Sequence, residues 1–177
     1  MILYHGTTLI RGEKIIKDKC IKHRISRVYK NMGNINLNTT DGYVYLTPDI
    51  DLAYYYGNIN LIQSNTSDNM KYVYIFKVDV DETKLKPDMD NLRINHIENQ
   101  KDIITREESI KFCRTVAVSE DVNIKDMEYI KLPGTMNNIE SKDNLNIVRK
   151  LSKASFNDLD VDAIMKDILC RWSWQKV

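Results

Sequence analysis

The segment from Lys71 to Val80 constrains the fold most strongly, because aromatic and β-branched residues fill most of its positions. Such residues favour extended backbone, and this segment follows a polar stretch, which is typical of a β-strand. The chain is therefore expected to contain a sheet. Shorter segments with the same character are also predicted to be strands: residues 2–5, 43–46, 115–118 and 127–132.

Helix signals lie between and after these strands. A helix is expected to start at Thr47-Pro48, with threonine as the N-cap and proline at the first helical position, and to stop at Gly57. Thr105 to Glu108 fits a capping box that opens a short helix. Residues 145–151 and 159–172 are predicted to be helices, whereas 19–41 and 63–69 are expected to be loops.

The order of these segments predicts an α+β fold, with short helices among the strands and a helical C-terminal tail. The length of 177 residues suits one domain. We expect residues 1–135 to form the main domain, and residues 136–177 to form a helical extension packed on it.

Composition narrows the possible partners. Lys and Arg total 26 and Asp and Glu total 25, a net charge of +1, which gives no electrostatic reason to expect nucleic acid or an anionic membrane. No segment approaches the run of about 20 apolar residues that a membrane span needs. Cys20, Cys113 and Cys170 lack metal-ligand spacing. We therefore expect a cytoplasmic protein without a signal peptide, a disulfide or a bound metal.

The first segment with chemical potential is Tyr4-His5-Gly6-Thr7. A histidine at a strand end followed by glycine places an imidazole where backbone can approach a ligand closely, and Thr7 adds a hydroxyl. A single histidine is more often structural, so this segment alone does not predict a site.

The second segment is Tyr43-Val44-Tyr45-Leu46-Thr47-Pro48 together with the helix that follows it. Alternation along a strand places Tyr43 and Tyr45 on one face. Three consecutive tyrosines, 54 to 56, then lie about 100° apart around the helix, so at least one of them is expected to face away from the core. Taken alone, these rings would be interpreted as packing.

Taken together, the two segments resemble the ADP-ribosyltransferase superfamily. The likeness is to its His-Tyr branch, which includes diphtheria toxin and the poly(ADP-ribose) polymerases, and more narrowly to the rifamycin-modifying enzymes. It rests on Tyr4 to Thr7 and on Val44 to Thr47, with Asp51 and Ala53 after them. Residues 72–80 and 114–118 resemble later strands of that family. The resemblance implies a split β-sheet core and NAD⁺ as the substrate.

The resemblance also implies roles for individual residues. His5 would hydrogen-bond the adenosine ribose, with Gly6 and Thr7 beside the dinucleotide. Tyr45 would stack on nicotinamide, and Tyr55 or Tyr56 would pack against the other side of that ring. A carboxylate would stabilise the oxocarbenium-like ribose that forms as the glycosidic bond breaks.

The carboxylate has several candidates. In the rifamycin-modifying enzymes an aspartate follows the strand that corresponds to residues 72–80, and Asp88 lies in the matching place, with Asp90 as the reserve. Glu107 and Glu108 precede the position where the polymerase branch carries a glutamate. Asp88 can equally be a turn residue after Pro87.

The expected activity is mono-ADP-ribosyl transfer to a protein, such as a host or phage protein, or to a small molecule. Bacterial toxins and phage counter-defence proteins of this superfamily are often this small. One alternative is an NAD⁺-dependent RNA 2′-phosphotransferase. The resemblance to those enzymes is weaker, because they carry a His-Leu pair at the place where this chain has Tyr45. Another alternative is a catalytically degenerate member of the fold that binds a partner protein.

Overall fold

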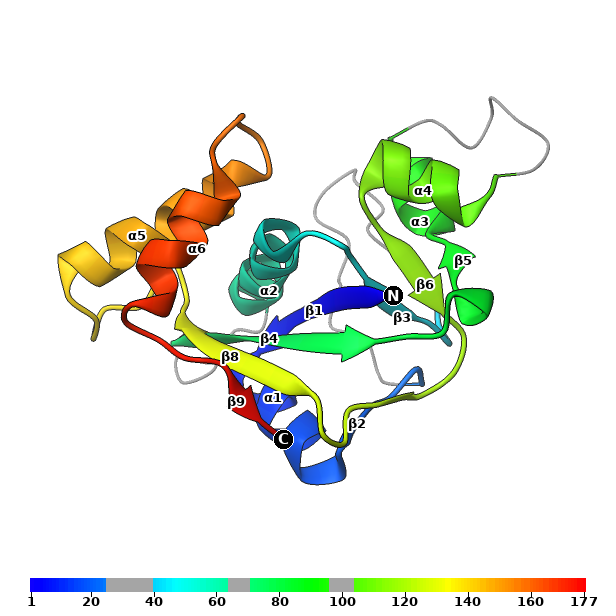
Figure 1. Ribbon diagram of the computed structural model, residues 1–177, viewed down its shortest axis with the longest axis horizontal. Coiled ribbons are helices and arrows are strands. Elements are labelled where there is room, and N and C mark those ends of the chain that lie inside the picture. The colour runs from blue at the N-terminus through cyan, green and yellow to red at the C-terminus, as the bar shows by residue number, and fades with distance from the viewer. Residues whose placement is uncertain (25–39, 64–70, 96–103) are drawn as a thin grey trace.

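Two sheets that meet at one strand edge organise the molecule (Figure 1). The structure is a computed structural model that describes residues 1–24, 40–63, 71–95 and 104–177. The larger sheet is antiparallel and has the order β1-β4-β8-β9, formed by β1 (Ile2–Thr8), β4 (Tyr72–Asp79), β8 (Glu128–Pro133) and β9 (Gln175–Lys176).

The smaller sheet has the order β3-β6-β5, formed by β3 (Val44–Leu46), β6 (Val116–Val118) and β5 (Lys86–Pro87). It joins the larger sheet at β1. The backbone N–H of Tyr4 donates to the Thr47 carbonyl at 2.7 Å, and the N–H of Thr47 donates to the Tyr4 carbonyl at 3.0 Å. A separate pair, β2 (Cys20–Ile21) and β7 (Val122–Asn123), lies beyond α1.

Helices cover both faces of the larger sheet. On one face lies α1 (Leu9–Asp18); on the other lies α2 (Ile50–Gln63), with α5 (Lys142–Ala154) and α6 (Val161–Leu169) beside it (Figure 1). Near β5 and β6 lie α3 (Met89–Ile94) and α4 (Arg106–Cys113), after a 3₁₀ turn at Glu82–Lys84. The fold is α+β.

Two apolar cores follow from the alternation of side chains along the strands. Leu3 and Phe76 face a core shared with α1 and the smaller sheet, whereas Val73 and Ile75 face a core shared with α2, α5 and α6. The C-terminal segment contributes buried side chains to the second core: Leu145, Val148, Leu151, Ala154, Ile164 and Ile168. Residues 136–177 therefore share their apolar core with the helix that follows β3.

Several elements match their prediction from sequence. The aromatic segment forms β4, and the segments at 2–5, 43–46, 115–118 and 127–132 form β1, β3, β6 and β8. The capping box at Thr105 is present, because its side chain accepts from the Glu108 N–H while the Glu108 carboxylate accepts from the Thr105 N–H. The predicted loop 19–41 is wrong at its start, because Cys20–Ile21 forms β2 through pairing with β7. Residues 25–39 of that loop and residues 64–69 of the predicted loop 63–69 lie outside the described residues.

The predicted end of α2 is wrong. The helix continues through Gly57 to Gln63. A Cβ at position 57 would lie 2.3 Å from Cγ1 of Val73 and 3.4 Å from the backbone nitrogen of Thr7. Gly57 therefore allows α2 to pack closely on β1 and β4 instead of ending the helix. The helix also begins at Ile50, two residues after Pro48, and the Thr47 hydroxyl accepts from the Asp49 N–H at 3.0 Å in the turn before it.

Candidate functional site

The junction of β1 and β3 brings His5 next to Tyr45. Nδ1 of His5 lies 3.0 Å from the backbone carbonyl oxygen of Tyr45. A carbonyl can only accept, so this hydrogen bond requires the proton on Nδ1. In the neutral imidazole, Nε2 then carries a lone pair and can accept a hydrogen bond from a ligand hydroxyl. The two residues expected to carry the site are therefore neighbours in the fold.

The imidazole of His5 is held in its neutral form. Burial lowers its pKa below the ordinary value, and the positive charge of Arg11 acts in the same direction, while the hydrogen bond to the Tyr45 carbonyl opposes them. His5 is half-buried in the middle of β1, where it pairs with Phe76 of β4. The expected position at a strand end is therefore wrong, because the strand continues to Thr8. At neutral pH this histidine is a fixed hydrogen-bonding group rather than a cation.

The hydroxyl of Tyr45 donates a hydrogen bond to the carboxylate of Asp90 in α3. The same carboxylate accepts from the Thr40 backbone N–H at 2.6 Å and from the Thr40 hydroxyl at 2.7 Å, and Nη1 of Arg93 lies 3.6 Å away. Asp90 is 4% exposed. The negative charge nearest to the Tyr45 hydroxyl in these contacts is thus Asp90, the reserve candidate.

Asp88, the first candidate for the acid, caps α3. Its carboxylate accepts from the Asn91 backbone N–H at 3.0 Å, and its own N–H donates to the Ser109 hydroxyl at 2.9 Å. The side chain is 5% exposed, and burial raises the pKa of Asp88 to about 6, although hydrogen bonds from Asn91 and Thr115 oppose that shift. The arrangement gives Asp88 a structural role at the start of the helix.

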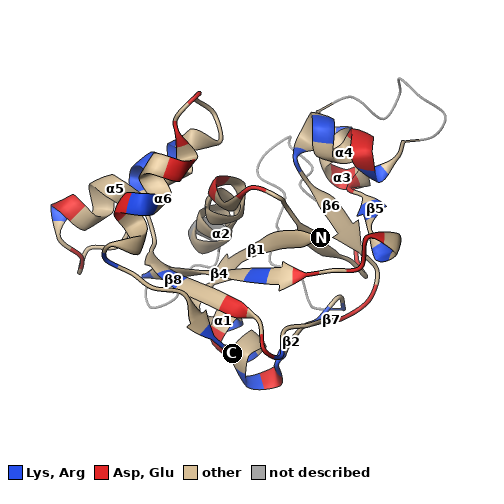
Figure 2. Cartoon of the chain, in the orientation of Figure 1, with Lys and Arg blue, Asp and Glu red and all other residues tan. Residues whose placement is uncertain are grey.

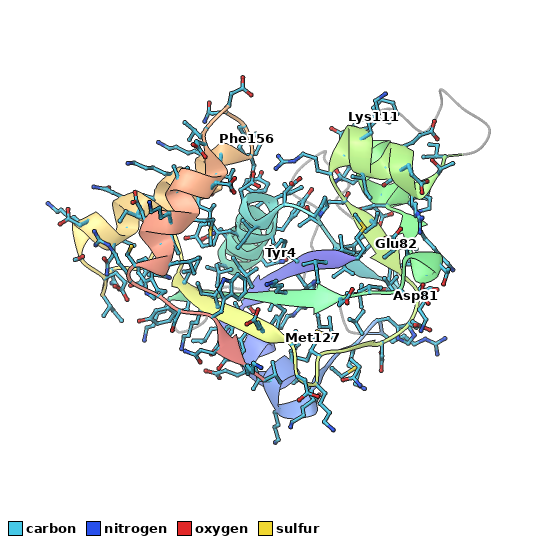
Figure 3. The ribbon with its side chains drawn as sticks, in the orientation of Figure 1. Tyr4, Asp81, Glu82, Lys111, Met127 and Phe156 are labelled. Carbon is cyan, nitrogen blue, oxygen red and sulfur yellow. The ribbon has the colours of Figure 1, made fainter. Side chains whose placement is uncertain are left out.

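The two candidate tyrosines of α2 lie in different surroundings. The hydroxyl of Tyr56 accepts a hydrogen bond from Nδ2 of Asn91 at 3.0 Å, which places Tyr56 beside α3. The Tyr55 ring instead meets the edge of Phe156 at 4.8 Å between centroids. Figure 3 shows Phe156 at the turn between α5 and α6. Tyr54 is buried and donates to the Pro133 carbonyl at 2.5 Å.

Gly6 and Thr7 are both packed inside the protein. A Cβ on Gly6 would lie 1.7 Å from the Ala53 carbonyl oxygen, so the space that the glycine leaves is filled by α2. The sequence pattern suggested that a ligand would lie close to Gly6. In the structure, the backbone of α2 lies there instead. Thr7 is 2% exposed.

An ion-pair network at the start of α2 was not predicted from the sequence. Nε of Arg114 donates to the Asp49 carboxylate at 2.7 Å. Nη2 of the same arginine lies 2.9 Å from each carboxylate oxygen of Asp51. Asp51 is 1% exposed and also accepts from the Ser155 hydroxyl at 3.0 Å. Residues far apart in the sequence meet here, so spacing along the chain could not reveal the network.

The remaining acidic and histidine candidates have local partners. Glu108 completes the capping box of α4, and Glu107 pairs with Nε of Arg106 at 2.6 Å. His23 binds Asp121 through both its backbone N–H and Nδ1, at 3.0 and 2.7 Å. Among the described residues, no group of three or more His, Cys, Asp or Glu side chains could hold a metal ion.

Charges of both signs are interspersed along α1, α4, α5 and α6, whereas α2 carries only Asp51, and β1 and β3 carry no Lys, Arg, Asp or Glu (Figure 2). In the described part of the chain, every helix is too short or too polar to span a bilayer. Comparisons with protein-family models, with curated proteins and with solved structures found no match to this chain.

Proposed function

We propose that this protein is an NAD⁺-dependent mono-ADP-ribosyltransferase, which cleaves the bond between nicotinamide and ribose and transfers ADP-ribose to an acceptor. The acceptor is a protein, such as a host or phage protein, or a small molecule, and the reaction takes place in the cytoplasm. The proposal extends to the fold: the two sheets that meet at β1 and β3 correspond to the split sheet of that superfamily.

One observation carries the proposal. The imidazole of His5 and the backbone of Tyr45 are joined by a hydrogen bond of 3.0 Å at the point where the two sheets meet. A histidine and a tyrosine separated by 40 positions in the chain thus occupy one strand junction.

In the proposed reaction, Nε2 of His5 accepts a hydrogen bond from a ribose hydroxyl, as its assigned tautomer allows. The Tyr45 ring stacks on nicotinamide, and Tyr56 is the favoured second ring because its hydroxyl also contacts α3, next to the residue that binds Tyr45. Stacking retains the leaving group while the bond lengthens and positive charge appears on the ribose.

Asp88 and Asp90 are the proposed sources of negative charge for that transition state. A carboxylate acts more strongly on the cationic transition state than on bound NAD⁺, so its effect appears mainly in kcat. Both side chains are buried and hydrogen-bonded. Comparing Asp88→Ala with Asp90→Asn therefore identifies which charge matters.

Release of nicotinamide from NAD⁺, measured with and without cell lysate as acceptor, tests the proposal. We expect the wild-type protein to release nicotinamide, and His5→Ala and Tyr45→Ala to lower kcat/KM by at least about 100-fold, equivalent to roughly 3 kcal/mol of lost transition-state stabilisation. Phe112→Ala is a matched control, because this exposed aromatic residue lies on α4. If the wild-type protein neither binds NAD⁺ nor releases nicotinamide, the proposed enzymatic activity is refuted.

A non-enzymatic binding module is the second candidate function. It is favoured by the burial of both α3 carboxylates, 5% exposed for Asp88 and 4% for Asp90, which leaves neither at the surface of the site. Isothermal titration distinguishes the two functions: a module of this kind binds a partner protein without turnover of NAD⁺.

A further inference from the structure

Two neighbouring residues of α3 bind the hydroxyls of two tyrosines that come from different elements. Asp90 accepts a hydrogen bond from Tyr45 of β3, and Nδ2 of Asn91 donates to the hydroxyl of Tyr56 of α2 at 3.0 Å. These are the two rings for which stacking is proposed. A short helix that the sequence pattern does not predict therefore determines where both hydroxyls lie.

We infer that Asp90 and Asn91 are positioning residues, which hold the rings of Tyr45 and Tyr56 in the orientation that receives the planar nicotinamide group. The inference rests on the proposed function and adds to it the residues that set the geometry of the ring site. Because Asp90 is 4% exposed, it acts through the Tyr45 hydroxyl rather than by touching the ligand.

The carboxylate of Asp90 is itself held in a fixed orientation. Oδ2 accepts from both the Tyr45 hydroxyl and the Thr40 N–H, and Oδ1 accepts from the Thr40 hydroxyl. Nη1 of Arg93 lies 3.6 Å from Oδ1. Rotation of the carboxylate would break several of these contacts, so Asp90 provides a rigid acceptor for the phenol.

The orientation of the Asn91 amide is also defined. Besides Tyr56, its Nδ2 contacts the Thr115 hydroxyl at 2.9 Å and the Cys113 carbonyl at 3.5 Å, and a carbonyl can only accept. Its Oδ1 accepts from Nδ2 of Asn95 at 3.0 Å. The amide nitrogen therefore points toward Tyr56, and the amide oxygen points toward Asn95.

Fixing both hydroxyls reduces the freedom that each ring would lose when it stacks on a ligand. Such preorganisation increases affinity without adding any contact to the ligand. The expected consequence is a change in KM for NAD⁺ when a hydroxyl or its partner is removed, even where kcat changes little.

The first experiment compares Asp90→Asn with Asp90→Ala in the nicotinamide-release assay. Asparagine can present its oxygen to the Tyr45 hydroxyl and the Thr40 N–H, with its amide group toward the Thr40 hydroxyl, whereas alanine can do neither. We expect Asp90→Ala and Tyr45→Phe each to raise KM about tenfold, as for the loss of one hydrogen bond to a charged group. Asp90→Asn should change KM by less than about twofold, whatever its effect on kcat.

For the second ring, Asn91→Ala and Tyr56→Phe should raise KM to a similar extent. Met89→Ala is the matched control, because Met89 lies on the same helix and is exposed. Equal KM values for Asp90→Asn and Asp90→Ala would overturn the positioning role of Asp90. Equally raised values would mean that the charge matters, and values equal to wild type would mean that neither the charge nor the hydrogen bond does.

The second experiment uses no NAD⁺, and so separates this inference from the proposed function. Thermal unfolding is measured for Tyr45→Phe, Asp90→Ala and the double variant. If Asp90 acts through the Tyr45 hydroxyl, the double variant loses less than the sum of the two single losses. The hydroxyl of Tyr45 also lies 3.3 Å from the Thr40 carbonyl, so a small further loss beyond Asp90→Ala is expected. Additive decreases in unfolding temperature would show that the two groups are independent and would overturn the inference. A wild-type protein that releases no nicotinamide refutes the proposed function, and with it the ligand assigned to the rings. The cycle still decides whether Asp90 positions Tyr45.

Discussion

The β1–β3 junction and the first turn of α3 both contribute residues to the proposed site, but different interactions hold them. At the junction, backbone hydrogen bonds join the strands, and helix α2 packs directly on the backbone of Gly6. At α3, polar groups hold one another: Asp88, Asn91, Ser109 and Thr115. The buried carboxylate of Asp90 instead binds Tyr45 and Thr40. The junction therefore depends on backbone pairing and close backbone packing, whereas the turn of α3 depends on side-chain hydrogen bonds and protonation.

This difference has consequences for tolerance to change. A shape constraint fails when volume is added, because the backbone atoms of a helix and a strand cannot both move without disturbing the core. A polar network fails when a partner is removed and a buried group is left unsatisfied. The two regions should therefore respond to opposite kinds of substitution.

The largest expected effect is that of Gly6→Ala. The added Cβ would lie 1.7 Å from the Ala53 carbonyl oxygen, so α2 must shift away from β1. We expect a loss of at least about 3 kcal/mol in the free energy of unfolding, measured by urea denaturation. Gly42→Ala is the control: Gly42 has nothing within 4 Å of the added Cβ but has a φ of 87°. It should lose only about 1 kcal/mol. Similar losses for the two variants would contradict a shape constraint at Gly6.

Asp88 should make stability depend on pH. Burial raises its pKa to about 6, above the value of about 4 expected in the unfolded chain. The native state therefore retains the proton that the unfolded state releases. The stabilisation is complete below about pH 4 and is lost as pH rises through 6, with a total change of about 2 to 3 kcal/mol.

Asp88→Asn tests that dependence, because its amide oxygen can still cap the Asn91 N–H. Urea denaturation between pH 4 and pH 7.5 should give a flatter profile for the variant and greater stability than wild type at pH 7.5. Unchanged pH dependence in the variant would show that another group is responsible.

A smaller effect is expected for Ser109→Ala. The hydroxyl of this fully buried serine donates to the Thr115 carbonyl at 2.7 Å and accepts from the Asp88 N–H at 2.9 Å. Its removal leaves both groups without this partner and should lower the free energy of unfolding by about 2 kcal/mol. Ser119→Ala, at an exposed position after β6, should change stability by less than about 0.5 kcal/mol. Chemical denaturation of both variants measures the difference.

The smallest effect is predicted at the end of β1, where Thr8 is the N-cap of α1. Its hydroxyl is buried and makes no capping hydrogen bond, and it has no partner among the described residues. Thr8→Val should therefore stabilise the protein by about 1 kcal/mol. The same change at Thr105, whose capping box is complete, should lower stability by about 1 kcal/mol. Opposite signs in thermal unfolding are the expected result; a loss at both positions would disprove the interpretation of Thr8.

The agreement between sequence and structure is best where local patterns act alone. The strand at residues 71–80, predicted from its aromatic and β-branched composition, and the capping box at Thr105 depend on local sequence, and both are present as expected. The pattern fails at Gly57, because glycine serves both as a helix terminator and as a site of close packing. Val73 and Thr7 lie against Gly57 in the structure, which shows that this glycine permits close packing and does not end the helix.

The sequence alone predicted the α+β order of elements, because strand and helix patterns are local properties of the chain. A family resemblance in two short motifs, and not the local pattern, selected His5 and Tyr45 as site candidates. The tertiary structure decided the rest: that α3 forms, that Asp90 meets Tyr45 while Asp88 caps a helix, and that Arg114 binds Asp51. These contacts join residues 45 or more positions apart or depend on burial. Neither long-range proximity nor desolvation is recorded in the local spacing of residues.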